Sequence, residues 1–107
     1  MIEMIRKFFL PKKIIKIKGK NSFEQLSEAE LGMMIDAFLD NDESKFDVFA
    51  IYEFRLMRYK DKRVEGIRNQ VLAIEIKNRT VAQPDGLDTP SARDSLRALS
   101  YHLKNQG

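Results

Sequence analysis

The feature that most constrains this chain is a helix-start signal followed by apolar residues at helical spacing. In the pattern Ser27-x-x-Glu30, the serine hydroxyl accepts from the Glu30 N–H while the glutamate carboxylate reaches back to the Ser27 N–H. The apolar residues that follow recur every three or four positions, as on one face of a helix: Leu31, Met34, Ile35, Phe38 and Leu39. The polar run at 40–42 then ends the pattern, so the sequence predicts a helix between the capping box and this run.

A second helix is predicted at the carboxyl end of the chain. Thr89 suits the N-cap, and Pro90 suits the first helical position, where its missing N–H costs nothing. We expect this helix to end near Asn105. Its inward-facing residues are predicted to be Leu96, Leu99 and Leu103.

Residues 46–77 fit two structures. Ser44 and Asp47 give a weaker helix cap, and apolar residues at helical spacing follow in two groups: Phe49, Tyr52, Leu56 and Tyr59, then Val64, Ile67, Val71 and Ile74. Residues 52–56 and 72–77 instead alternate as in a β-hairpin, and Gly66 weakens a helix. Because each helical pattern extends over ten or more residues and each alternation over only five or six, we predict helices, with a hairpin in 46–77 as the alternative.

The fold expected from these patterns is mainly α: a small domain of three to four helices with a basic amphipathic N-terminal segment. A length of 107 residues fits a single domain over 1–107 that buries a core without a metal or a disulfide. The chain has no cysteine, which excludes disulfides, thiolate metal sites and cysteine nucleophiles, and suits a cytoplasmic protein. Residues 82–88 are rich in turn formers and are expected to link the body of the domain to the last helix.

The basic amphipathic segment comprises residues 1–20. Apolar residues of 1–10 lie on one face of a predicted short helix, which Pro11 must end. Residues 15–18 alternate like a short edge strand with outward lysines, and residues 19–21 are expected to form a turn. The first apolar run is too short for a secretory signal, and no stretch is long enough to span a membrane.

Charge is segregated along the chain. Residues 1–20 carry seven basic side chains and one acidic, a net charge of +6. Residues 21–54 carry nine acidic side chains and one basic, a net charge of −8, and residues 55–79 return to +5. Since electrostatic fields are screened beyond about 8 Å at physiological salt, these blocks matter more than the overall net charge of +3.

Nothing in the sequence indicates catalysis, so we predict no enzyme, no cofactor and no metal site. The single histidine, His102, excludes a site built from several imidazoles, and the five glycines never cluster into a phosphate-binding loop. A calcium-loop pattern starting at Asp40 fails because its sixth position is Lys45 and its twelfth is Ile51, where glycine and glutamate are required.

The function expected from these features is that of a small regulatory or adaptor protein that binds another protein through a charged helical surface. The acidic block offers this surface, and a basic protein is its expected partner. The residues predicted to contact the partner are Glu24, Glu28, Asp36, Asp40, Asp42, Glu43 and Asp47.

Two alternatives use the basic N-terminal segment. Its cations suit a nucleic-acid-binding regulator, in which lysines displace counterions from phosphates, or a protein peripheral to an anionic membrane. A third interpretation is that the segment only packs on the domain. The residues involved in the first two alternatives are Arg6, Lys7, Lys12, Lys13, Lys16, Lys18 and Lys20.

Overall fold

The computed structural model describes residues 13–105, which form a compact all-α globule. A single 3₁₀ turn, η1, precedes four helices. Their bounds are η1 Phe23–Gln25, α2 Glu28–Asp40, α3 Ala50–Leu56, α4 Lys62–Asn78 and α5 Pro90–Lys104. The predicted helix of residues 1–10, with Arg6, Lys7 and Lys12 beside it, lies outside the described residues.

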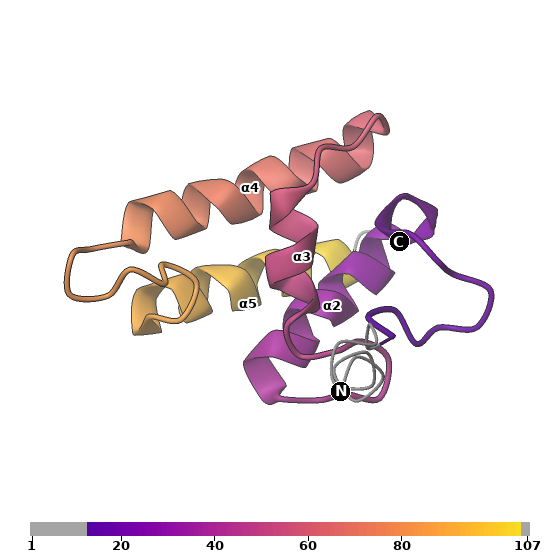
Figure 1. The fold of residues 1–107 in the computed structure, drawn as a ribbon, viewed down its shortest axis with the longest axis horizontal. Helices are drawn as coiled ribbons and strands as arrows, with labels where there is room; N and C mark the ends of the chain where they lie inside the picture. Colours follow the sequence, from indigo (N-terminus) through magenta and orange to yellow (C-terminus); the bar gives the residue numbers. More distant parts are fainter. Residues whose placement is uncertain (1–12, 106–107) are drawn as a thin grey trace, which may run out of the picture.

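Each helix packs on two others, and α2 and α5 form the most extensive pair. Helix α4 packs on α5, and the short helix α3 contacts both α2 and α4. In Figure 1, α3 crosses in front of α2 and links the lower part of the molecule to the start of α4 at the top. Among the described helices, only α2 and α4 make extensive contact with α3.

Two of the three predicted caps are present in the structure, whereas the cap expected from Ser44 and Asp47 is not formed, because α3 begins at Ala50 with Phe49 at its N-cap and no side-chain cap hydrogen bond. Ser27 Oγ accepts from the Glu30 N–H at 3.1 Å, and Glu30 Oε1 accepts from the Ser27 N–H at 2.8 Å. Thr89 Oγ1 accepts from the Ala92 N–H at 3.1 Å, with Pro90 following it. Helix α4 also has an N-cap, which the sequence pattern did not reveal. Asp61 Oδ1 accepts from two N–H groups of the first turn, at 2.9 and 3.2 Å.

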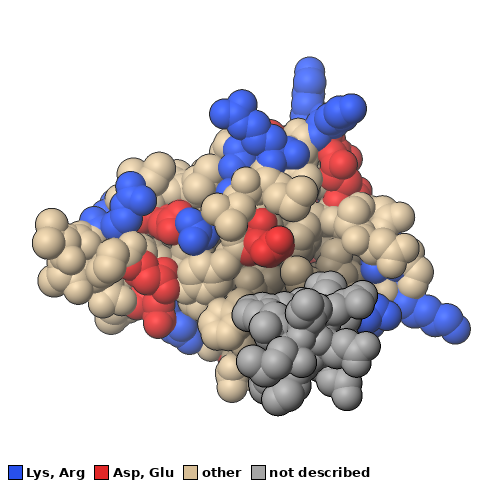
Figure 2. All heavy atoms as spheres, in the orientation of Figure 1, with Lys and Arg blue, Asp and Glu red and all other residues tan. Residues whose placement is uncertain are grey.

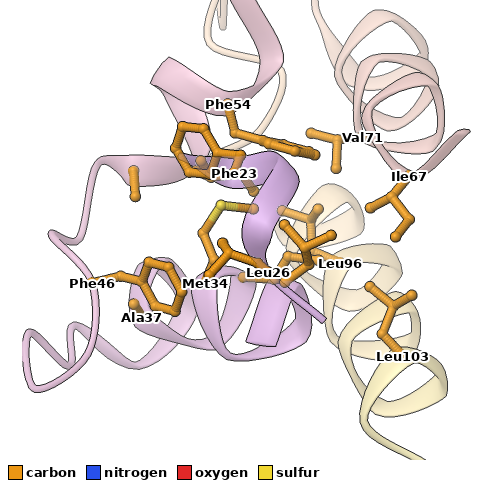
Figure 3. Packing of buried hydrophobic residues seen from close by; sticks show 14 of the residues in the cluster. Phe23, Leu26, Met34, Ala37, Phe46, Phe54, Ile67, Val71, Leu96 and Leu103 are labelled. Carbon is orange, nitrogen blue, oxygen red and sulfur yellow. The ribbon is translucent and has the colours of Figure 1, made fainter. Parts of the chain in front are cut away.

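The core gathers side chains from all four helices and from the loops between them (Figure 3). Met34 of α2, Phe54 of α3, Val71 of α4 and Leu96 of α5 are fully buried, and each such side chain contributes roughly 1.5–3 kcal/mol. Phe46 is also fully buried, although it lies in the loop between α2 and α3. The helical interpretation of 46–77 is thus correct, and the hairpin is not formed.

The helix predicted from the spacing of Phe49, Tyr52, Leu56 and Tyr59 is shorter than this spacing indicates. Helix α3 contains only seven residues, so Tyr59 lies beyond it, and Phe49 and Leu56 are 65% and 69% exposed. The side chains of α3 that enter the core are instead Ala50, Ile51 and Phe54. Both faces of this helix carry apolar residues, and the packing against α2 and α4 selected the face that spacing alone did not favour.

The predicted edge strand at 15–18 is reduced to one antiparallel bridge between Ile15 and Phe46. The Lys16 N–H donates to Lys45 O and the Asp47 N–H donates to Ile14 O, both at 2.9 Å. Residues 13–105 form no strand. The bridge nevertheless fixes the segment at 13–17 against the loop that precedes α3.

The segment at 82–88 lies between α4 and α5, and its residues 85–87 pack on the domain while 82–84 and 88 are exposed. Leu87 is fully buried, and Asp85 Oδ1 accepts from the Leu87 N–H at 3.0 Å. Gly86 is buried against the end of α4, where a Cβ atom on Gly86 would lie 2.0 Å from Glu75 O. No helix of the described residues has both the length and the apolar composition needed to cross a membrane.

The close approach at Gly86 predicts a strong effect of one methyl group. We expect Gly86→Ala to destabilise the protein by about 1–3 kcal/mol, because the new Cβ meets backbone that cannot move aside. The matched control is Gly66→Ala in the exposed middle of α4, where no atom lies within 4 Å and alanine should stabilise by roughly 0.5–1 kcal/mol. Urea denaturation of both variants measures the difference, and equal stabilities would contradict the packing described.

Candidate protein-binding surface

Two of the seven predicted acidic contact residues are held by α5. Asp36 of α2 receives hydrogen bonds from Arg97 at 3.0 Å, from the buried Ser100 hydroxyl at 2.6 Å, and from Lys104. Asp40 receives two hydrogen bonds from Arg97, at 2.5 and 3.1 Å, and the first cause of its lowered pKa is this contact. These carboxylates join α2 to α5, so their charge is largely balanced within the molecule.

The other five predicted acidic residues do not form one open surface. Asp47 is buried and accepts from the Phe49 N–H at 2.9 Å, while Glu24 accepts from the Asp61 N–H at the same distance. Asp42 is exposed, and a hydrogen bond from the Ser44 backbone lowers its pKa. Glu43 is exposed in the following loop, and Glu28 is half-buried at the start of α2.

Of the predicted basic contact residues, the structure describes four lysines. Lys16 Nζ donates to Glu43 O at 2.8 Å, and Lys20 Nζ donates to Gln25 O at 2.8 Å and lies 3.5 Å from Glu30. Lys13 and Lys18 are exposed, with no ion pair or hydrogen bond from their side chains to another described residue.

The second basic block pairs mainly with acidic residues of its own region. This block comprises residues 55–79, and ion pairs between it and the acidic residues of 24–43 are one arrangement that the sequence allows. The structure instead pairs Arg55 with Glu75 at 2.8 Å, Arg68 with Glu65 at 2.9 Å and Arg63 with Asp61 at 3.7 Å. Asp36 and Asp40 of α2 pair with α5, which is the helix packed beside them.

Helix α3 and its two flanking residues carry more exposed large apolar side chains than any other described element. We define the α3 face as Phe49, Tyr52, Glu53, Leu56 and Met57. Phe49, Leu56 and Met57 are 65%, 69% and 50% exposed, and Tyr52 is half-buried. Exposed apolar residues that gather in this way, rather than singly, are typical of interaction sites.

Tyr52 anchors the α3 face to the rest of the domain. Its hydroxyl donates to Asp85 Oδ2 at 2.5 Å, and burial and this hydrogen bond raise its pKa. The Tyr52 ring packs edge-on against Phe38, with ring centroids 5.5 Å apart, and the Arg55 guanidinium carbon lies 5.3 Å from the Tyr52 ring centroid. The face is therefore fixed in place by α2 and by the loop before α5.

A second network fixes the end of α3. Arg68, 8% exposed, donates to Arg55 O at 3.0 Å and makes two hydrogen bonds of 2.9 Å with Glu65. Glu65 also accepts from the Tyr59 N–H at 3.0 Å, and the Tyr59 hydroxyl donates to Phe54 O at 3.0 Å. This network positions residues 57–59, which border a cavity.

The cavity has a volume of about 440 Å³ and adjoins the α3 face. Residues 13–15 and 20–24 line one side, and Glu53, Met57, Arg58 and Tyr59 line the other. Volumes of 300–1,000 Å³ with apolar walls and a few polar groups are typical of binding sites. The α3 face and this cavity form one continuous candidate surface, since Glu53 and Met57 belong to both.

The sequence contained a signal for this surface. Phe49, Tyr52 and Leu56 have the spacing of one helical face. A second apolar set on the same helix, Ala50, Ile51 and Phe54, was the indication that one of the two faces would remain outside. The cavity itself has no signal in the sequence, because its walls are brought together by the bridge at Ile15.

Within the described residues, no three or more histidine, aspartate or glutamate side chains form a group that could hold a metal ion. His102 lies exposed on the last turn of α5, as its position beside the leucine stripe predicted. Comparison with protein-family models, curated proteins and solved structures finds no significant match. The functional interpretation therefore depends on the residues of this chain.

The Arg68–Glu65 contact predicts a pH dependence of stability. Hydrogen bonds from Arg68 and from the Tyr59 N–H lower the pKa of Glu65 from 4.5 to about 2. The stabilisation is present above pH 4.5 and is lost as the pH falls toward 2, because the unfolded chain takes up the proton first.

We expect Glu65→Gln to unfold at lower urea than the wild type at pH 7 and to lose less stability between pH 7 and pH 3. The control is Glu53→Gln, whose carboxylate has no hydrogen-bonding partner in the part of the chain that the structure describes. It should lose as much stability as the wild type over the same interval. Equal losses in all three proteins would contradict this role of Glu65.

Proposed function

We propose that this protein is a small, non-enzymatic binding module that recognises another protein through the α3 face. The observation that carries the proposal is the exposure of Phe49 and Leu56 on a helix that two networks hold in place. Burying such side chains at an interface removes apolar area from water at little conformational cost, since the surface needs no rearrangement.

The acidic residues predicted from the sequence are less suited than the α3 face to be the primary contact with a partner protein. Asp36 and Asp40 are engaged by Arg97, and Asp47 is buried. A partner would have to displace these contacts before it gained any new ones. Exposed ion pairs contribute only about 0–1 kcal/mol each, whereas apolar and aromatic anchors dominate most interfaces. We therefore place the contact on the α3 face and treat Asp42 and Glu43 as peripheral.

The proposal predicts that binding depends on Leu56. The full chain, Leu56→Ser and Val81→Ser are each immobilised, and proteins retained from native lysate are quantified by mass spectrometry. Val81 is the matched control because it is fully exposed, 103%, in a loop away from α3. At least one protein should be retained by the wild type and by Val81→Ser, and be depleted tenfold or more by Leu56→Ser.

Retention by all three proteins alike, or by none, would contradict the proposal. Surface substitutions of this kind usually change stability by less than about 0.5 kcal/mol, and thermal unfolding of each variant checks this. Nucleic-acid binding and peripheral membrane association are the rival proposals. RNA, DNA or anionic vesicles retained equally by wild type and Leu56→Ser would favour one of them over the α3 face.

A further inference from the structure

We propose that the cavity beside the α3 face receives a large apolar side chain of the partner protein, and that an acidic residue next to that side chain meets Lys13 and Arg58. This inference rests on the proposed function and names the chemistry of the segment that is recognised.

The walls of the cavity suit an apolar side chain. Ile15 and Phe23 are 7% and 6% exposed, so they present a fixed apolar surface on one side. Tyr59 lies beside Phe23 with its ring edge-on and the two ring centroids 6.2 Å apart, and it stacks on Phe54 with a centroid distance of 5.2 Å. Because burial raises the pKa of Tyr59 and its hydroxyl is engaged by Phe54 O, this residue offers its ring rather than a charge.

Some charged side chains that line the cavity already form hydrogen bonds or ion pairs within the described residues, and others do not. Glu24 accepts from the Asp61 N–H, and Lys20 is held by Gln25 O and Glu30. Lys13 and Arg58 make no hydrogen bond or ion pair through their side chains with another residue of 13–105, and both line the cavity. The two cations come from different segments of the chain, since Lys13 precedes the bridge at Ile15 and Arg58 follows α3.

The surroundings reinforce this positive charge. Residues 13–20 contain four lysines and no acidic residue, and residues 57–60 contain Arg58 and Lys60 and no acidic residue. Figure 2 shows blue side chains at the upper and right edges of the displayed face, with red side chains beside the upper ones and at its centre. Glu53, the one available carboxylate of the cavity, lies a helical turn before Met57. An acidic group of the partner is therefore favoured at the end where Lys13 and Arg58 stand.

The test is a peptide-display selection against the full chain, since a random library offers every combination of apolar and charged neighbours. Enriched peptides should share a large apolar residue with aspartate or glutamate beside it. A synthetic copy of the best peptide should bind the wild type at least threefold more tightly than its amide analogue, in which that acid is Asn or Gln. Raising the salt concentration should narrow the difference.

Arg58→Glu tests the assignment of the contact. In this variant the acidic peptide and its amide analogue should bind alike, or the amide more tightly, because the attraction has become a repulsion. Lys60→Glu makes the same change in net charge on a side chain that does not line the cavity, and it should keep the preference for the acidic peptide. A loss of folding cannot imitate this pattern, since each comparison uses two peptides on one protein.

The outcomes separate this inference from the proposed function. The inference is overturned if the peptides require Leu56 but show no preference for an acidic residue. It is also overturned if that preference survives Arg58→Glu. Either result leaves the α3 face as the proposed contact. Peptides that bind Leu56→Ser as tightly as the wild type overturn both. A selection that enriches no sequence also counts against both, because the cavity is present in the free protein.

Discussion

The close approach of α2 and α5 is the contact on which the rest of the structure depends. It is possible because position 32 is glycine: a Cβ there would lie 2.9 Å from Lys104 Cγ and 3.0 Å from Ser100 O. The buried Ser100 hydroxyl donates to Gly32 O at 3.0 Å and to Asp36, so the contact is also satisfied in its hydrogen bonds. With these two helices in contact, α4 covers α5 and α3 is left across α2 with an open side.

This arrangement explains why part of the charge segregation along the sequence is balanced within the described part of the structure. The acidic block includes α2, which lies beside the arginine and lysine of α5, and the basic block around α4 carries its own glutamates. Much of the opposite charge of these blocks is balanced by ion pairs between neighbouring side chains. Such pairs contribute little individually to stability, but they occupy the carboxylates that a basic partner would need.

The α3 face owes its rigidity to residues far from it in sequence. Tyr52 is held by Asp85, and the end of α3 is held by Arg68 from α4. A seven-residue helix is too short to be stable alone, so these contacts keep it formed while one of its faces stays apolar and exposed. Pre-organisation of this kind is favourable for binding, because little ordering remains to be done when a partner arrives.

The sequence by itself determined the helical fold class, the starts of α2 and α5, and most of the buried faces of α2, α4 and α5. Ser27, Thr89 and Pro90 act locally, and the leucines of α5 have a single apolar face, so no tertiary information was needed. Helix α3 is different. Both Phe54 and Leu56 are suited to a core, and only the positions of α2 and α4 decided that Phe54 is buried and Leu56 is not. The ion-pair partners of Asp36 and the walls of the cavity were likewise decided by the tertiary structure, because they join residues that are distant along the chain.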